Sequence, residues 1–374
     1  MPQRSASGFS PICSLRPTSQ TEVQRYRLRS FSAVILLLIA LGATLQADSG
    51  GEPIRHFQPP RETRLEQLVA SDGEPLLVRA WGATDSPQLI LLGIHGFTDY
   101  GRGFAHLSTQ LTGVAKHPML VLAFDQRGFG ESASRGRWAG LPLMLSDLDS
   151  VLDWIDRQHP GTPVILIGES MGAALVLAAF NREGWSGPAS LRGVVLLAPA
   201  IWGWSSMPWY QRLSLEIGSA LWPSLQVSGR GARQLGIRPT DDPSVAEYLG
   251  RDPNMLRNVS LGMLAGLTDL MEQAGSSRIP QQPPTLVAVG GRDRVIPLPA
   301  VCRWASQQGA EGPSEQWLFQ EEGYHMLTRQ KAAGEVLDAV GHWIGQLLEG
   351  PPAALHASGN GLLQREAALA KLCS

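Results

Sequence analysis

Apolar residues form two alternating patterns along this chain. Short, strongly apolar runs, typical of strands, occupy residues 75–81, 88–94, 119–124, 163–167, 191–198, 285–289 and 315–319. Apolar residues at helical spacing predict helices over residues 104–114, 143–155 and 336–348. Strands that alternate with helices predict an α/β fold, in which a mostly parallel sheet is covered by helices on both faces.

The alternation breaks between residues 199 and about 279. This stretch contains four tryptophans and helical patches such as Leu261–Leu267. It predicts a helical insertion between two strands of the sheet and no further strands.

The two ends of the chain differ from the middle. Arg25, Arg27 and Arg29 precede an apolar run over residues 31–43, a pattern that fits the core of a signal peptide and is short for a membrane span. We expect residues 1–47 to be a cleaved signal or a retained membrane anchor, with a buried core helix as the less favoured reading. The protein would then be periplasmic, secreted or anchored outside the cytoplasm.

The remaining boundaries follow from composition. A polar linker is expected over residues 48–64 and the main domain over residues 65–349. Residues 350–374 contain two prolines near their start and a glycine-rich stretch, so we expect a disordered tail.

Composition excludes several classes of function. The chain has 374 residues, 43% of them hydrophobic, and a formal net charge of −2, which gives no reason to expect a nucleic-acid partner. Cys13, Cys302 and Cys373 are odd in number and far apart, and they suggest neither a metal site nor a disulfide framework. The eight histidines include no HExxH pair, so no metal is predicted.

The strongest chemical signal is the segment Gly168–Gly172, with sequence GESMG. It follows a buried strand and precedes a run of helix-forming residues, which is the setting that a nucleophile elbow requires. In such a turn the hydroxyl of Ser170 is exposed above the sheet, and the first amides of the helix are free to donate to an oxyanion. Ser170 is therefore predicted to be a nucleophile.

A serine nucleophile needs a base, and the base needs an acid to orient it. Functional side chains in such sheets gather beyond the carboxyl ends of the strands. Asp293 follows the strand over residues 285–289, and His325 follows the strand over residues 315–319. The order serine, aspartate, histidine predicts the triad Ser170, Asp293 and His325, although Asp293 alone would equally suit a turn.

The oxyanion hole is predicted from backbone amides. His95 and Gly96 follow an early strand, and the residue after such a glycine supplies one donor. We assign the amides of Phe97 and Met171 to the pair.

Five segments together resemble the α/β-hydrolase superfamily, and most closely its monoacylglycerol lipase and lysophospholipase group. They are HGF at His95–Phe97, DQRGFGES at Asp125–Ser132, GESMG at Gly168–Gly172, GRD at Gly291–Asp293 and GYH at Gly323–His325. The resemblance runs from about residue 77 to residue 348. It implies eight core strands, a helical cap inserted after the sixth at about residues 199–279, and hydrolysis of carboxylic esters without a cofactor.

The sequence departs from that group at two positions. Glu169 stands where a histidine is frequent, and Ala173 stands where a further glycine is frequent. These departures weaken the substrate assignment and leave the expected chemistry unchanged. The segment Asp125–Ser132 is expected to be structural, since its glycines make a tight loop beside the site.

The predicted function is cleavage of lipophilic carboxylic esters, of monoacylglycerol or lysophospholipid type, through an acyl-enzyme. Trp202, Trp204 and Trp209 are candidate contacts for an apolar acyl chain, although packing of the cap onto the core accounts for them equally well. The expected partner is a small lipophilic ester, with membrane association through the N-terminal apolar segment.

Other functions stay open to different degrees. A proline-type aminopeptidase or another amidase would need cap carboxylates to hold the substrate amine, and four are available: Glu216, Asp241, Asp242 and Glu247. Dehalogenase and epoxide-hydrolase chemistry requires an aspartate at the elbow, so Ser170 argues against both. A non-enzymatic binder of hydrophobic ligands would be expected to have lost part of the triad.

Overall fold

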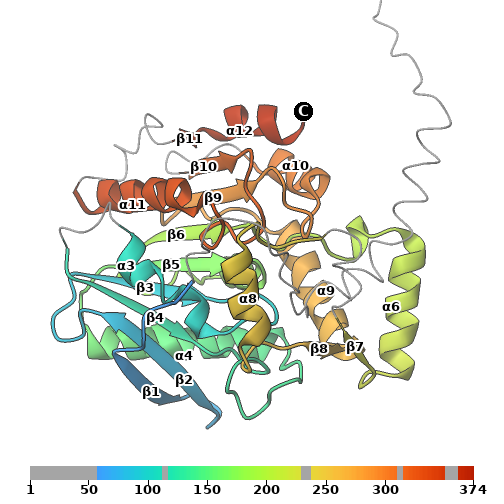
Figure 1. The fold of residues 1–374 in the computed structure, drawn as a ribbon, viewed down its shortest axis with the longest axis horizontal. Helices are drawn as coiled ribbons and strands as arrows, with labels where there is room; N and C mark the ends of the chain where they lie inside the picture. Colours follow the sequence, from blue (N-terminus) through green and yellow to red (C-terminus); the bar gives the residue numbers. More distant parts are fainter. Residues whose placement is uncertain (1–56, 112–116, 229–236, 310–314, 350–360) are drawn as a thin grey trace, which may run out of the picture.

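The computed structural model describes residues 57–111, 117–228, 237–309, 315–349 and 361–374. Within these residues lies a nine-stranded sheet with the strand order β1-β2-β4-β3-β5-β6-β9-β10-β11 (Figure 1). The six strands from β4 to β10 are parallel, while β1, β2 and β11 each run antiparallel to a neighbour. The strands are β1 (Arg64–Val69), β2 (Pro75–Gly82), β3 (Leu89–Ile94), β4 (Met119–Phe124), β5 (Val164–Glu169), β6 (Leu191–Leu197), β9 (Thr285–Gly290), β10 (Glu315–Gln320) and β11 (Leu362–Leu363).

Both faces of the sheet are covered by apolar layers. On β3, Leu89 and Leu91 face the layer that contains α3 and α11, whereas Ile90 and Leu92 face the layer that contains α4 and α5. This double burial explains why the central strands are continuous apolar runs. The elements outside the cap are η1 (Gly101–Phe104), α3 (Leu107–Gln110), α4 (Leu141–Gln158), α5 (Met171–Phe180), α10 (Leu298–Ser306), α11 (Ala333–Glu349) and α12 (Arg365–Leu372). The predicted α/β-hydrolase fold is confirmed, and β11 adds a ninth strand to the eight that were expected.

A cap lies between β6 and β9, beside the sheet in Figure 1. Its helix α9 packs on α5, and α6 packs on α9. A short antiparallel pair, β7 with β8, also lies in this segment, so the expectation of an insertion without strands is wrong in that detail. The cap elements are η3 (Trp204–Ser206), α6 (Trp209–Leu221), β7 (Gln226–Ser228), α8 (Pro243–Arg251), β8 (Asn258–Ser260) and α9 (Leu261–Ser276).

The end of the chain differs from the expected disordered tail. Residues 361–374 form β11, which pairs with β10, and α12, which buries Ala368 and Leu372. A disulfide joins Cys302 of α10 to Cys373, with a Cα–Cα distance of 5.4 Å. The expectations of a tail disordered over these residues and of no disulfide are therefore wrong. The segment is held by contacts with residues far away in the chain, among them Cys302, which precedes Cys373 by 71 residues. Residues 350–360 of the expected tail lie outside the described residues.

Two further local features differ from what was expected from the sequence. The first strand, β1, has only one buried residue and was not predicted from its pattern. A helix was expected over residues 104–114, but its described part, residues 104–111, contains the end of the 3-10 turn η1 and the single turn α3, and residues 112–114 lie outside the described residues.

The predicted signal or anchor lies outside the described residues, together with residues 48–56 of the predicted linker. Within the described part of the chain, no helix has the length and apolar character needed to cross a bilayer.

Candidate active site

The elbow, residues 168–172, joins the end of β5 to the start of α5. Ser170 lies between them with φ 55° and ψ −113°, a backbone conformation that residues other than glycine rarely adopt. Its amide donates to the carbonyl of Leu197 at 2.9 Å, and its carbonyl accepts from the amide of Ala200 at 3.1 Å. The strand β6 and the residues that follow it therefore hold this strained turn in place.

The glycines of the elbow are required by space. A Cβ atom on Gly172 would lie 1.9 Å from the carbonyl oxygen of Ile94, and one on Gly168 would lie 2.6 Å from the amide nitrogen of Ala173. Neither approach is possible for a side chain. The spacing that predicted the turn from the sequence thus has a direct steric cause.

The structure brings His325 and Asp293 together. Nδ1 of His325 lies 2.7 Å from Oδ2 of Asp293, and both side chains are almost fully buried. The other oxygen of Asp293, Oδ1, accepts hydrogen bonds from the backbone amides of Val295 at 2.7 Å and Ile296 at 3.1 Å. The carboxylate is therefore fixed from both sides and orients the imidazole through Nδ1.

Nearby charged groups also change the pKa of the His325 imidazole. Burial lowers the pKa of His325, but the adjacent carboxylate of Asp293 and the nearby charge of Glu169 more than offset it and raise the pKa above its usual value. A carboxylate partner of this kind stabilises the imidazolium that forms when a histidine accepts a proton.

The oxyanion loop, residues 95–99, lies against the elbow. A Cβ atom on Gly96 would lie 3.4 Å from Cβ and 4.0 Å from Oγ of Ser170. Within the described part of the chain, neither the amide of Phe97 nor that of Met171 donates to another backbone group. Both amides therefore remain available as donors beside the serine.

His95 has a structural role in this loop. The amide of Gln126 donates to its Nε2 at 3.0 Å, so the proton is on Nδ1, which donates to the carbonyl of Gly96 at 2.9 Å. Burial lowers the pKa of His95 and keeps the ring neutral. The ring of Phe129 packs edge-on against both His95 and Phe97. The segment Asp125–Ser132 thus supports the oxyanion loop from the neighbouring strand end.

A buried ion-pair network was not predicted from the sequence. Arg329, in the histidine loop (residues 321–332), pairs with Glu169 of the elbow and with Asp99 of the oxyanion loop. Glu169 stands where the resembled group frequently has a histidine, and the arginine explains why a carboxylate fits there. This ion pair also places the histidine loop directly on the elbow. No local pattern could reveal it, since the three residues are far apart in the chain.

The three candidate tryptophans of the cap have different surroundings. Trp202 is buried and donates through its ring nitrogen to the carbonyl of Ser206. Trp204 is half-buried and donates to Asp269, while Trp209 lies on α6 with 76% of its surface exposed. Trp209 therefore forms no part of a dry wall here, and substrate contact by Trp202 and Trp204 stays a prediction.

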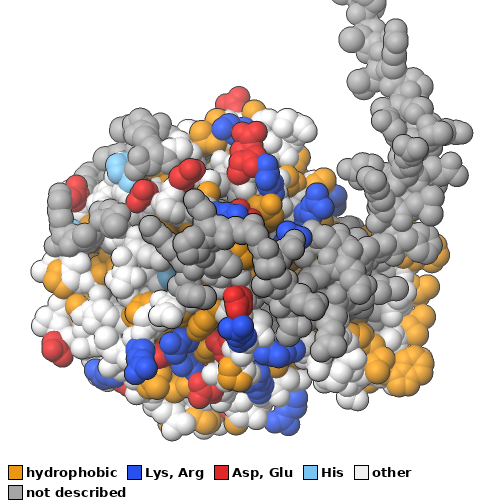
Figure 2. All heavy atoms as spheres, in the orientation of Figure 1, with side chains coloured by type: hydrophobic (Ala, Val, Ile, Leu, Met, Phe, Trp, Pro, Cys, Tyr) orange, Lys and Arg blue, Asp and Glu red, His pale blue; other side chains and the backbone are white. Residues whose placement is uncertain are grey.

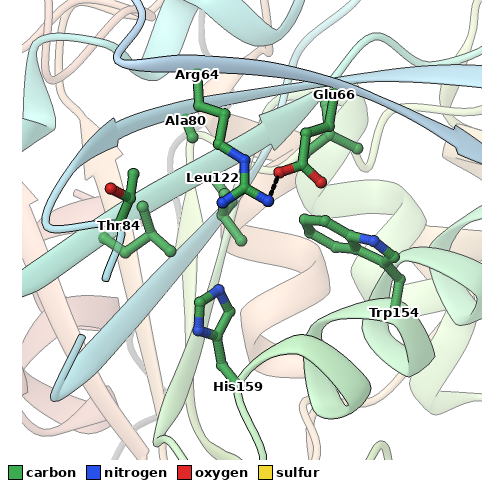
Figure 3. Close-up of a pocket in the computed structure, with 9 residues that line it drawn as sticks. Arg64, Glu66, Ala80, Thr84, Leu122, Trp154 and His159 are labelled. Atoms are coloured by element: carbon green, nitrogen blue, oxygen red, sulfur yellow. Dashed lines mark ion pairs between the residues drawn. The ribbon is translucent and has the colours of Figure 1, made fainter. Parts of the chain in front are cut away.

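A recess elsewhere on the surface is remote from this chemistry. It is lined by residues of β1, β2 and β4 together with Trp154 and His159, and Arg64 pairs with Glu66 at its edge (Figure 3). His159 immediately follows α4 and lies before the start of β5, so the recess faces the amino ends of the parallel strands. Ser170 follows the carboxyl end of β5, at the opposite edge of the sheet.

Comparison with known proteins shows the family of the chain. Residues 85–332 match the family model described as serine aminopeptidase, S33. The chain belongs to this family of α/β hydrolases. Human monoglyceride lipase is 24% identical over 292 residues, which cover 75% of this chain and 90% of the lipase. The monoacylglycerol lipase of Mycolicibacterium smegmatis is 26% identical over 287 residues, which cover 75% of this chain and 97% of that protein.

Solved structures show the same fold. A soluble variant of monoglyceride lipase from Saccharomyces cerevisiae superposes with a TM-score of 0.59 at 18% identity, covering 78% of this chain and 98% of that one. With the family and these relatives established, this member of the S33 family is an ester-hydrolysing enzyme.

Proposed function

We propose that the protein cleaves lipophilic carboxylic esters, of monoacylglycerol or lysophospholipid type, with Ser170, His325 and Asp293 as a catalytic triad. The observation that carries the proposal is the buried pair of His325 and Asp293, in which His325 lies on a loop that is ion-paired to the nucleophile elbow. A histidine oriented in this way is what a serine hydroxyl needs in order to lose its proton.

The proposed reaction is acyl transfer in two steps. His325 accepts the proton of Ser170 as its oxygen attacks the ester carbonyl, and the amides of Phe97 and Met171 stabilise the oxyanion. The imidazolium then protonates the leaving alcohol, and a water molecule activated by the same histidine resolves the acyl-enzyme. Asp293 stays ionised throughout. Each oxyanion donor is expected to contribute a factor of about 10²–10³ to turnover.

The surface of the cap supports a lipid substrate. Trp209, Leu213, Ile217 and Leu221 recur at intervals of four along α6, and all four side chains are exposed. Figure 2 shows apolar side chains gathered over this helix, at the right of the view. Contiguous exposed apolar surfaces mark sites of interaction. A substrate presented in a lipid aggregate would explain the apolar stripe on α6.

The aminopeptidase alternative is weaker, although the family model takes its description from that activity. It needs carboxylates free to bind an amine, and the cap carboxylates have other partners. Glu216 pairs with Arg212, Glu247 pairs with Arg251, Asp242 caps the start of α8, and Asp241 accepts from the amide of Lys331.

The disulfide supports export. Disulfides persist in oxidising compartments and are rare where thiols are kept reduced. Cys302 and Cys373 form such a bond, and the apolar run over residues 31–43 follows a basic segment. We infer that the domain acts outside the cytoplasm, as a secreted, periplasmic or membrane-anchored enzyme.

Two measurements test the proposed function. A fluorophosphonate probe should label the wild-type protein and fail to label Ser170→Ala, whereas equal labelling of both would exclude Ser170 as the nucleophile. A panel of p-nitrophenyl esters of rising chain length, assayed beside amino-acid amides, should show a preference for the longer esters. Faster cleavage of the amides would favour the peptidase.

A further inference from the structure

Three of the four segments that carry the proposed chemistry meet at one arginine. Arg329 lies in the histidine loop, four residues after His325. Its Nη2 atom pairs with Oε2 of Glu169, which directly precedes the nucleophile, and lies 2.6 Å from Oδ2 of Asp99 in the oxyanion loop. The guanidinium group of Arg329 therefore joins the histidine loop, the elbow and the oxyanion loop.

This arrangement is buried. The side chains of Arg329, Glu169 and Asp99 are only 2%, 5% and 4% exposed. Burying charges costs solvation free energy, so such a network is better suited to selecting one geometry than to adding stability. Arginine suits the role, because its long, permanently charged side chain places one nitrogen, Nη2, against both carboxylates at once.

The elbow and the oxyanion loop, which the arginine joins to the histidine loop, each contain a strained residue. Ser170 has φ 55°, and Thr98, next to Asp99, has φ 67°. Positive φ values at non-glycine residues persist only where surrounding contacts impose them. An ion pair at the neighbouring residue in each segment is such a contact.

We propose that Arg329 is a positioning residue for acyl transfer. Through Glu169 and Asp99 it sets the position of the nucleophile and of the oxyanion amides relative to His325. The proposal rests on the proposed function, since it concerns the rate of that same reaction. Arg329 acts through its two partners and touches no reacting atom.

Two variants separate positioning from charge. Arg329→Lys keeps the charge but moves the contacting nitrogen, because the lysine side chain is one bond shorter and lacks the planar guanidinium. The triple variant Arg329→Met, Glu169→Gln and Asp99→Asn removes all three charges, so no buried carboxylate is left unpaired. The matched control is Arg182→Lys, because Arg182 forms a two-bond pair with Asp149 beyond the far end of α5.

The readout is kcat per active serine, with sites counted by complete fluorophosphonate labelling and turnover measured on a p-nitrophenyl ester. Because only labelled sites are counted, loss of folded protein does not change this value. A misplacement of about 1 Å can cost about 10²-fold in rate. We therefore expect kcat to fall by about 10- to 100-fold in both variants, with KM changed by less than about threefold and the control within about twofold.

The outcomes distinguish the two proposals. A kcat per labelled site within twofold of wild type, in either variant, would overturn the positioning role and leave the serine mechanism intact. The same holds if the control falls as far as the Arg329 variants. If the wild-type protein is not labelled, or Ser170→Ala retains full turnover, the proposed function itself fails.

Discussion

Replacing Asp293 by asparagine tests the proposed triad, because backbone hydrogen bonds fix how the side chain at this position faces His325. Oδ1 of Asp293 accepts from the amides of Val295 and Ile296, and Oδ2 faces Nδ1 of His325 at 2.7 Å. In Asp293→Asn only one side-chain atom can accept hydrogen bonds, and the two backbone amides hold it at the Oδ1 position. The new NH₂ group then faces His325, where it can only donate.

This substitution is expected to invert the tautomer of the histidine. Nδ1 of His325 must accept, so its proton moves to Nε2, which then cannot take the proton of Ser170. The comparable change in serine proteases lowers kcat by about 10⁴-fold. That loss corresponds to about 5.4 kcal/mol of activation free energy. The fold should persist, because both backbone hydrogen bonds to the side chain are kept.

The assay is p-nitrophenyl ester turnover, measured beside thermal unfolding. Asp85→Asn is the control, since Asp85 is an exposed residue at the amino end of β3, on the opposite edge of the sheet. We expect wild-type turnover from the control and almost none from Asp293→Asn. A folded Asp293→Asn protein that loses less than about tenfold in kcat would refute the assignment of Asp293 as the orienting acid.

Three further results are expected. Catalysis needs neutral His325, whose pKa is raised above 6.5, so kcat/KM should fall as the pH drops through a midpoint above 6.5; a midpoint below 6.5 contradicts this. Gly172→Ala should lower the free energy of unfolding by about 1–3 kcal/mol or more and abolish turnover, because its Cβ would lie 1.9 Å from a carbonyl oxygen. Gly334→Ala, with no atom within 4 Å of the new Cβ, should cost nothing, and equal losses in urea unfolding would contradict the steric argument. Cys302→Ala should lose about 4 kcal/mol, since the disulfide closes a loop of 71 residues, and urea unfolding with and without reductant measures it.

Features of the active site could be predicted from the sequence where a short stretch of residues or the end of a strand specifies them. The elbow is specified within residues 163–179, because a buried strand, two glycines required by space and a helix follow one another directly. Asp293 and His325 were identified because parallel strands place their carboxyl ends at one edge of a sheet. The hydrogen bond between these two residues is consistent with that reasoning.

Features that join distant segments could not be predicted in the same way. From the sequence, Glu169 is only a departure from the pattern of the resembled group. Its role becomes visible in the fold, which places Arg329 against its carboxylate. The role of His95 likewise depends on the amide of Gln126, which arrives from the neighbouring strand.

By itself, the sequence of this protein determined the alternation of strands and helices, the nucleophile turn and the order of the three candidate catalytic residues. These depend on the spacing of apolar residues and glycines over short stretches, where local sterics and burial act. Only the tertiary structure decided the ordered C-terminal segment, the pairing of Cys302 with Cys373 and the buried arginine network. Each of these requires groups separated by dozens of residues to meet, and their free energy of interaction exists only once the sheet has assembled.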